Sequence, residues 1–204
     1  MLTLAIDTSL PILSVAVTRE GQQLASAAVE GKNSRNEKLL VIVDWLLGEA
    51  GVALHDLELL AVTRGPGSFT GVRVALATVL GMSLALRRPV CAMSTHEAIA
   101  SAMEGETLIY GDAGRGEFYV SAFRGREELL PASLLTRSEL DEKSAAFPSS
   151  ISVDEALRTS NVALLLAVHA TRIAASGQLA AYADQTPIYV RLAEAEARLL
   201  KKGI

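Results

Sequence analysis

The 204-residue sequence has few cysteines and histidines, the residues on which disulfide bonds and zinc sites depend. It contains one cysteine, Cys91, which cannot form a disulfide within the chain and whose apolar neighbours favour a small buried side chain. The three histidines, His55, His96 and His169, are far apart and lack the spacing of zinc ligands. We therefore expect a reducing, cytoplasmic environment and no metal site.

Excess positive charge and long hydrophobic runs are also missing. Lys and Arg number 19 against 23 Asp and Glu, which gives a net charge of −4 and excludes nucleic-acid binding that rests mainly on clustered basic residues. The longest weakly polar stretch, 74–86, is too short to span a bilayer, so we expect a buried helix and no membrane partner. The first apolar run ends at Asp7 after no basic region, which predicts no signal peptide.

What is present is a high apolar content, 50% of the residues, in patterns whose period changes along the chain. Alternation over 2–29 predicts an antiparallel meander of three strands, and helical spacing begins at Arg35. The sequence then predicts a strand at 59–63, a glycine-rich loop at 64–71, a helix at 72–86, a strand at 90–93 and a helix at 95–103. Strands joined by helical crossovers imply a mixed sheet flanked by helices.

A second lobe is predicted from about residue 105, where strand patterns start again. Its predicted elements are strands at 107–112, 118–123 and 127–130, a helix at 161–175 and a final helix at 192–202, while 133–156 is polar and shows no clear period. We expect an N-terminal lobe over 1–105, completed by the C-terminal helix within 192–204, and a smaller, shortened lobe over 106–191.

The most informative motif is Gly65-Pro66-Gly67-Ser68-Phe69-Thr70-Gly71-Val72-Arg73. Its glycines allow close approach of the backbone, Ser68 and Thr70 can cap the next helix, and amide groups at a helix start can bind an anion such as phosphate. The motif is not a P-loop, because no Lys-Ser/Thr pair closes it. Two interpretations remain open: a phosphate or interface site, or a tight turn without a ligand.

Two other polar groups carry the same ambiguity. Asp7 ends the first strand and is followed by Thr8 and Ser9, which suits a hydrated metal or a phosphate but also an aspartate that caps its own turn. Asp112 and Arg115 lie together in a predicted hairpin of the second lobe, where a plain turn is the simpler interpretation.

Two helices carry more apolar residues than one core face needs. On the helix from Arg35, the core face is formed by Leu39, Leu40, Val43, Leu46 and Leu47. Val41, Ile42 and Trp45 lie on the opposite side, and the helix at 72–86 is apolar nearly all round. Because the lobe is small, these second faces favour contact with another chain.

These segments resemble the TsaB (YeaZ) family. The resemblance rests on Ile6-Asp7-Thr8-Ser9, on Ser14-Val15-Ala16-Val17, on the motif from Gly65 to Arg73, and on Pro187-Ile188-Tyr189-Val190-Arg191. It covers 1–125 and returns near 187–192. It implies an α/β fold of the two-lobed actin-like ATPase (ribonuclease H-like) type, with mixed sheets flanked by helices.

The resemblance also implies a function in the synthesis of threonylcarbamoyladenosine in tRNA. In that family's complexes TsaD is catalytic and binds a metal through a His-x-x-x-His pair, TsaB-like subunits bind and activate it, and an ATPase, TsaE, joins them. Here the sequence reads Asn33-Ser34-Arg35-Asn36-Glu37, without histidine, which supports a subunit with no catalytic residue. The partners implied are TsaD and TsaE, tRNA indirectly through the complex, and a second copy of the chain when alone.

By this resemblance the partner contact lies on the second helix faces and the glycine-rich motif. The interface residues expected are Val41, Ile42, Trp45, Gly67, Ser68, Phe69, Thr70, Val72, Leu76, Val79 and Met82. The sequence requires no cofactor, but ATP or ADP is able to sit near this interface. The nucleotide or phosphate contacts expected are Asp7, Thr8, Ser9, Gly65, Gly67, Ser68, Arg73, Asp112 and Arg115.

Two departures from the family pattern stand out. Many relatives have Asp-Ala-Arg where this chain has Asp112-Ala113-Gly114, which displaces the arginine to Arg115. The stretch 126–186 is short for the family, so the second lobe is expected to lack an element.

The alternative is an enzyme of the same fold, either a nucleotide-hydrolysing protein or a small-molecule kinase, with Asp7 and the loop at 65–71 around Mg-ATP. Phosphoryl transfer needs bound metal and phosphate clamps in both lobes, for which Asp7 and Asp112 are the evident candidates. A protease is not supported, because no nucleophile–base constellation or Gly-x-Ser-x-Gly elbow occurs.

Overall fold

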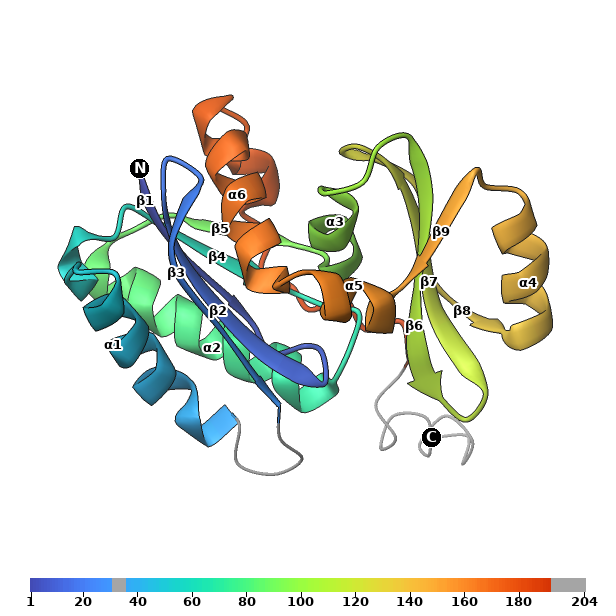
Figure 1. Ribbon diagram of the computed structural model, residues 1–204, viewed down its shortest axis with the longest axis horizontal. Coiled ribbons are helices and arrows are strands. Elements are labelled where there is room, and N and C mark those ends of the chain that lie inside the picture. The colour runs from blue at the N-terminus through green and yellow to red at the C-terminus, as the bar shows by residue number, and fades with distance from the viewer. Residues whose placement is uncertain (31–35, 192–204) are drawn as a thin grey trace, which may run out of the picture.

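The computed structural model describes residues 1–30 and 36–191, and within this range two β-sheets lie side by side with helices on their faces (Figure 1). The first sheet and its neighbouring helices comprise β1 (Leu2–Asp7), β2 (Ile12–Arg19), β3 (Gln22–Glu30), α1 (Leu39–Glu49), β4 (Leu59–Thr63), α2 (Phe69–Leu86), β5 (Val90–Met93) and α3 (Thr95–Ala100). The rest comprises β6 (Glu106–Gly114), β7 (Glu117–Arg124), β8 (Glu127–Thr136), α4 (Arg137–Ala145), β9 (Ser149–Ser152), α5 (Val153–Thr159) and α6 (Val162–Ala175). Short 3-10 helices are η1 (Asn36–Lys38), η2 (Leu54–Asp56) and η3 (Leu179–Tyr182).

The two sheets share one order of strands. The first has the order β3-β2-β1-β4-β5, with an antiparallel meander over β1 to β3 and parallel pairing of β1 with β4 and of β4 with β5. The second has the order β8-β7-β6-β9, with the same meander and one parallel neighbour. Among the described residues it therefore repeats the first sheet without a fifth strand. This repeated topology confirms the two-lobed actin-like ATPase (ribonuclease H-like) fold.

The first sheet is covered on both faces. Helices α1 and α2 pack on one face and α6 on the other (Figure 1). Because side chains alternate along a strand, Leu4 and Leu60 contribute to the core under α1 and α2, whereas Ala5 and Ala61 contribute to the core under α6. Burial on both faces explains why β1, β4 and β5 are rich in apolar and small residues.

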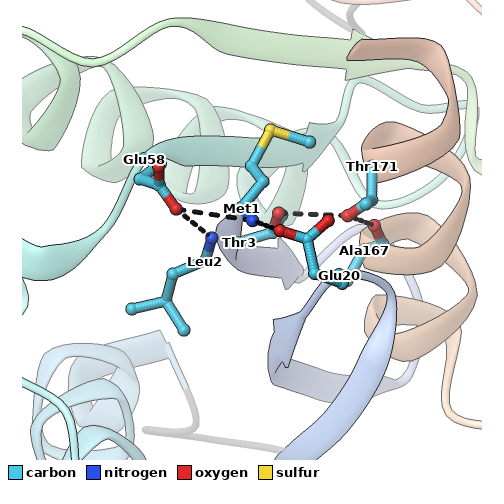
Figure 2. A network of polar contacts seen from close by, with 7 residues as sticks. All are labelled: Met1, Leu2, Thr3, Glu20, Glu58, Ala167 and Thr171. Atoms are coloured by element: carbon cyan, nitrogen blue, oxygen red, sulfur yellow. Dashed lines mark hydrogen bonds and ion pairs between the residues drawn. The ribbon is translucent and has the colours of Figure 1, made fainter. Parts of the chain in front are cut away.

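Polar contacts join α6 to the start of β1 (Figure 2). The hydroxyl groups of Thr3 and Thr171 are 3.1 Å apart, and Thr171 also donates to the carbonyl of Ala167 at 2.8 Å. Next to them, the backbone N–H of Leu2 donates to Glu58 at 2.6 Å, and this bond lowers the pKa of the Glu58 carboxyl. The first strand is thus held both to the covering helix and to the entry of β4.

Helix α6 crosses the division that the sequence suggested. It lies within 106–191 but packs against β1, β2 and β4 of the first sheet. Its N-cap Asn161 accepts from the N–H of Leu164 at 3.1 Å and donates to the carbonyl of Ala27 on β3 at 3.1 Å. The lobe boundary near residue 105 stays a prediction, and the helix expected within 192–204 lies outside the described residues.

Helix α2 is longer than the sequence indicated. It begins at Phe69 and has 18 residues, which makes it long and apolar enough to cross a membrane by length and composition alone. The stretch 74–86, whose length was used above to exclude a membrane span, is therefore only part of this helix. Val72, Leu76 and Val79 pack into the core under the sheet, however, as the inner face of a core helix does.

The polar stretch 133–156, for which the sequence showed no clear period, is regular in the structure. It contains the end of β8, then α4, β9 and the start of α5. Helix α4 buries one side chain, Leu140, and exposes most of the others, so it has almost no apolar stripe to detect.

Candidate functional site

A cleft of about 1100 Å³ lies between the two sheets. From the first part of the chain its walls are the loop between β1 and β2, the end of β3, the glycine-rich motif and the start of α3. From the second part they are β6, β7 and α5. A concave site between two lobes is a common place for a ligand.

Asp7 is buried at the end of β1 beneath this cleft. Its Oδ1 accepts from the Ser9 N–H at 3.2 Å, from the Ser9 hydroxyl at 2.6 Å and from the Thr63 hydroxyl. The Ser9 hydroxyl is also 2.8 Å from that of Thr95 at the start of α3. Asp7 therefore caps its own turn and links three element ends, while Ser9 lines the cleft.

The glycine-rich motif is clamped onto the turn after Asp7. The Ser68 N–H donates to the Ser9 carbonyl at 2.7 Å, and the Thr8 hydroxyl donates to the Gly71 carbonyl at 2.5 Å. A Cβ at Gly67 would lie 2.3 Å from the Ser9 carbonyl oxygen, and one at Gly71 would lie 1.9 Å from that of Thr8. These glycines are explained by close packing of two backbones.

The start of α2 is capped by a side chain of the motif itself. Ser68 is the N-cap, and its hydroxyl accepts from the Gly71 N–H at 3.2 Å. This confirms one of the two expected caps. Thr70, the other, is the second residue of the helix and is exposed. Because the N–H groups of Ser68 and Gly71 already have partners, they are not open for a phosphate.

Arg73 faces a different neighbour from the one expected of a phosphate ligand. Its guanidinium carbon lies 3.8 Å from the centre of the Phe69 ring, and its Nε donates to the Tyr189 hydroxyl at 2.8 Å. The rings of Phe69 and Tyr189 are 5.0 Å apart. Phe69 lines the cleft, but Arg73 and Tyr189 do not.

On the opposite wall, the structure brings one of the two predicted hairpin residues to the cleft. Asp112 lines it and accepts from the Gly114 N–H at 2.7 Å, whereas Arg115 lies in the turn with a positive φ of 63° and does not line it. Asp154 and Arg158 of α5 also line the cleft and were missed, because the sequence predicted no element between 130 and 161.

Buried and half-buried titratable groups lie at the wall of the cleft and behind it. His96, 1% exposed, lines it, places Nδ1 3.0 Å from the Ser121 hydroxyl, and has its pKa lowered to about 3 by burial. Glu97 accepts from the Tyr182 hydroxyl at 2.7 Å, and burial raises its pKa. Burial also raises the pKa of the Cys91 thiol to about 12, which makes it a poor nucleophile.

A metal site is not apparent where the structure describes the chain. Across residues 1–30 and 36–191, no three or more His, Cys, Asp or Glu side chains are grouped to hold an ion. Asp7 and Asp112, the two carboxylates that the sequence singled out, each accept hydrogen bonds from their own turns.

Several large apolar side chains are exposed on the outer sides of α1 and α2. Val41 and Trp45 are 69% and 54% exposed, and Phe69 is 38% exposed at the start of α2. Leu40, which the sequence assigned to the core face, is also exposed, as is Leu84, at 82%. We call Leu40, Val41, Trp45, Phe69 and Leu84 the outer apolar surface.

Three residues expected at a partner interface are buried instead. Val72, Leu76 and Val79 pack against the sheet, because they follow one another by four and three residues on the inner face of α2. The expectation for these three was wrong. Ile42 and Met82 are half-buried at the edge of the same core.

Each of the two helices carries an exposed glycine on its outer face. A Cβ at Gly81 in the middle of α2, or at Gly48 near the end of α1, would meet nothing within 4 Å. Glycine in a helix interior costs about 1 kcal/mol relative to alanine. Packing among the residues that the structure describes gives no reason for this cost, whereas close approach of another helix would give one.

Similar proteins are found by sequence and by structure. A family model described as "TsaD: tRNA N6-adenosine threonylcarbamoyltransferase" matches residues 31–199. The Bacillus subtilis (strain 168) "tRNA threonylcarbamoyladenosine biosynthesis protein TsaB" is 32% identical over 133 residues, 64% of this chain and 58% of that protein. The Escherichia coli (strain K12) protein of the same name is 33% identical over 132 residues, 62% of this chain and 57% of that protein.

These alignments span little more than half the length of the two relatives. The structural match is more complete. "YeaZ from Pseudomonas aeruginosa" is similar with a TM-score of 0.72 and 26% identity, covering 92% of this chain and 99% of that one.

Proposed function

Because the chain belongs to the family matched by the TsaD threonylcarbamoyltransferase model, and within it to the TsaB (YeaZ) proteins, we propose that it is a non-catalytic subunit in threonylcarbamoyladenosine synthesis. In this proposal it binds and activates a catalytic TsaD-type subunit, a TsaE-type ATPase joins them, and tRNA is met through the complex in the cytoplasm. The observation that carries the proposal is the outer apolar surface on α1 and α2.

This surface has the composition of a binding site. It combines an exposed tryptophan, Trp45, with aliphatic side chains at Val41 and Leu84, and the exposed Gly81 leaves room for a second helix. Large aromatic side chains supply much of the binding energy in protein interfaces. The net charge of −4 agrees with a subunit that leaves contact with tRNA largely to its partners.

A non-catalytic role agrees with the contacts of the titratable groups in and beneath the cleft. The Asp7 carboxylate, the first choice for metal or phosphate chemistry, accepts three hydrogen bonds from Ser9 and Thr63. His96 is held neutral by its burial, and the Cys91 thiol stays protonated. The alternative, a nucleotide hydrolase or small-molecule kinase, gains no support from these contacts.

A nucleotide near the interface stays a prediction. Among residues 1–30 and 36–191, the charged groups that line the cleft are the carboxylates of Glu30, Asp112 and Asp154 and the guanidinium of Arg158. This set does not fit a triphosphate, because the negative groups outnumber the positive one. We expect Mg-ATP or ADP to bind weakly to the chain alone in a calorimetric titration, and more tightly only if a partner supplies phosphate contacts.

The decisive test is reconstitution of tRNA modification. A mixture of the TsaD-type and TsaE-type subunits from the same organism, threonylcarbamoyl adenylate and tRNA is assayed with and without this chain. We expect modification to require the chain, and the chain alone to show none. Equal modification without it would contradict the proposed function.

The surface is tested separately by binding. Trp45→Glu should weaken binding to the TsaD-type subunit by about 2 kcal/mol or more, roughly thirtyfold in Kd, because a buried anchor would be replaced by a charge. The matched control is Leu24→Glu, which places the same charge on an exposed leucine of β3. Unchanged calorimetric binding of Trp45→Glu would place the contact on another surface.

A further inference from the structure

Residues 184–191, here called the strap, run without regular secondary structure from η3 across the glycine-rich motif to the second sheet. Neither the cleft chemistry nor the outer apolar surface explains why this segment carries so many directed polar contacts. The strap touches both walls of the cleft, because it contacts Phe69 on one wall and Ala113 on the other, and both residues line the cavity.

The first part of the strap is fastened to the motif's entry. Arg64 donates through Nη1 to the Asp184 carboxylate at 2.9 Å and to the Thr186 carbonyl at 3.2 Å. In return, the Ile188 N–H donates to the Arg64 carbonyl at 2.7 Å. At Gly65, an added Cβ would lie 3.0 Å from the Ile188 carbonyl oxygen, so the strap lies directly on the backbone there.

The middle of the strap is fastened to the start of α2. Tyr189 lies against the ring of Phe69, and its hydroxyl accepts from Arg73. Arg73 in turn lies over the Phe69 ring. This anchor combines aromatic packing with a directed hydrogen bond and a cation–π contact.

The end of the strap is fastened to the other lobe. Arg191 donates to the Ala113 carbonyl at 2.8 Å and to the Gly114 carbonyl at 3.2 Å, and it forms an ion pair with Glu117. All three acceptors belong to the hairpin of β6 and β7. A planar guanidinium that fills several acceptors at once is a strong and directional anchor.

The lobes are joined in a second, different way on the side of α3. There one continuous core contains Ile99 of α3, Ile109 and Phe123 of the second sheet, and Leu166 of α6. That apolar core can act as a hinge, since packed side chains resist separation but allow small rotations. The strap's contacts, by contrast, are mostly polar and partly exposed, with the Phe69–Tyr189 ring contact as the apolar one named above.

We propose that the strap is a latch, which fixes the angle between the two lobes about the α3 core and thereby sets the width of the cleft. Arg191 is the positioning residue that closes it. Removal of the Arg191 anchor lets the β6–β7 hairpin swing away from the motif while the α3 core stays packed. The latch is a property of the chain by itself and does not depend on the proposed function.

The test measures the distance across the cleft in the full chain. Nitroxide labels are placed at Glu30→Cys at the end of β3 and at Asp112→Cys on the β6–β7 hairpin, two exposed residues that line opposite walls of the cleft, and their separation is measured by double electron–electron resonance. The test variant is Arg191→Met, which keeps the side-chain stem but removes every donor. We expect a longer mean distance, a broader distribution and exchange of the hairpin amides that is faster on the order of tenfold.

The matched control is Arg124→Met, which breaks an arginine's ion pairs with Glu106 and Glu127 within the second lobe only. A distance distribution for Arg191→Met equal to that of the control overturns the latch. Should Arg191→Met fail to fold, Arg191→Lys replaces it, with Arg124→Lys as its control. A broader distance distribution in Arg191→Lys but not in Arg124→Lys supports the latch, and equal distributions in the two variants overturn it.

Discussion

The two faces of the first sheet are covered by helices of different kinds. On one face α6 is enclosed: Leu166 and Ala170 pack on the sheet, and the same core continues into the second lobe. On the other face α1 and α2 bury one side each and leave Val41, Trp45 and Leu84 exposed. One face is thus completed within the chain, while the other ends in an apolar surface.

This difference separates apolar residues that serve stability from those available for binding. A buried apolar side chain stabilises the fold through transfer from water and through packing. An exposed one contributes little to folding and gains its effect when a partner covers it. Substitutions on the two faces should therefore differ in which property they change.

The largest effect is expected inside the contact between α2 and the turn after β1. Gly71→Ala should reduce the free energy of unfolding by about 4 kcal/mol or prevent folding, because the new methyl group would lie 1.9 Å from the Thr8 carbonyl oxygen. Urea denaturation followed by circular dichroism measures this change.

The control for this substitution lies in the same helix. Gly81→Ala adds the same methyl group where nothing lies within 4 Å, and it should raise the stability by up to about 1 kcal/mol. Equal losses in the two variants would show that the inner and outer sides of α2 do not differ.

The next effect concerns the helix on the other face. Leu166→Ala on α6, where the side chain is fully buried, should cost about 3 kcal/mol through lost burial and a cavity. Leu84→Ala on the outer side of α2 should change stability by no more than about 0.5 kcal/mol. Thermal and urea unfolding of the two variants compare the faces with the same chemical change.

How far the sequence predicted these faces depends on the element. The bounds of β4 and β5 were correct, because short buried strands between turn residues leave a clear pattern. For α2 the sequence could not tell inner from outer residues, since an all-apolar helix has no polar face to orient it. Val72 and Leu84 were therefore indistinguishable until the sheet beneath them was known.

The second lobe was harder to predict for the opposite reason. Helix α4 is largely exposed and so nearly all polar, which hides it from any search for an apolar stripe. One local signal was available: Thr136 and Glu139 form a capping box, in which each side chain bonds the other's backbone N–H. Without α4 and α5 the sequence could not place Asp154 and Arg158 at the cleft.

The glycine-rich motif shows a limit of another kind. Its specificity to a family was readable, but the role of Gly67 and Gly71 required the position of the Thr8 and Ser9 carbonyls, which are far away in sequence. The Ser68 N–H and the Gly71 carbonyl bond the turn after Asp7, as a tight turn requires, while phosphate binding by the motif stays a prediction.

An intermediate effect is expected from acid. The pKa of His96 is about 3 in the fold, so the unfolded chain, with its ordinary value near 6.5, takes up the proton first. The contribution of neutral His96 to the free energy of unfolding is complete above about pH 6.5. It falls progressively as the pH drops toward about 3, by roughly 2 kcal/mol between pH 6.5 and 5. Burial lowers the pKa of His169 on α6 in the same direction.

This acid effect also separates the two faces. His96 and His169 lie on the side of α3 and α6, whereas the described residues buried on α1 and α2 include no titratable group. Hydrogen exchange at pH 5 should therefore show α3 and α6 losing protection before α1 and α2. Simultaneous loss in all four helices would contradict this. His55→Gln, at an exposed histidine, is the control variant.

The smallest effect is expected at the sole tryptophan. Trp45→Glu should leave the free energy of unfolding within about 0.5 kcal/mol of the original value, because the side chain is 54% exposed in the chain alone. Calorimetric unfolding measures it. A loss as large as that of Leu166→Ala would mean that Trp45 supports the fold, and the contrast between the faces would fail at this position.

Cys91 is the lone thiol of the chain and lies in β5, the edge strand of the first sheet. Its reaction with an alkylating reagent can therefore report on the opening of that edge. Since the thiol is fully buried and almost entirely protonated, an alkylating reagent can reach it only when β5 separates from the core that it shares with α3 and α6. The rate at which iodoacetamide consumes the thiol thus reports how often that edge opens. The native protein can be timed in this way without any added label.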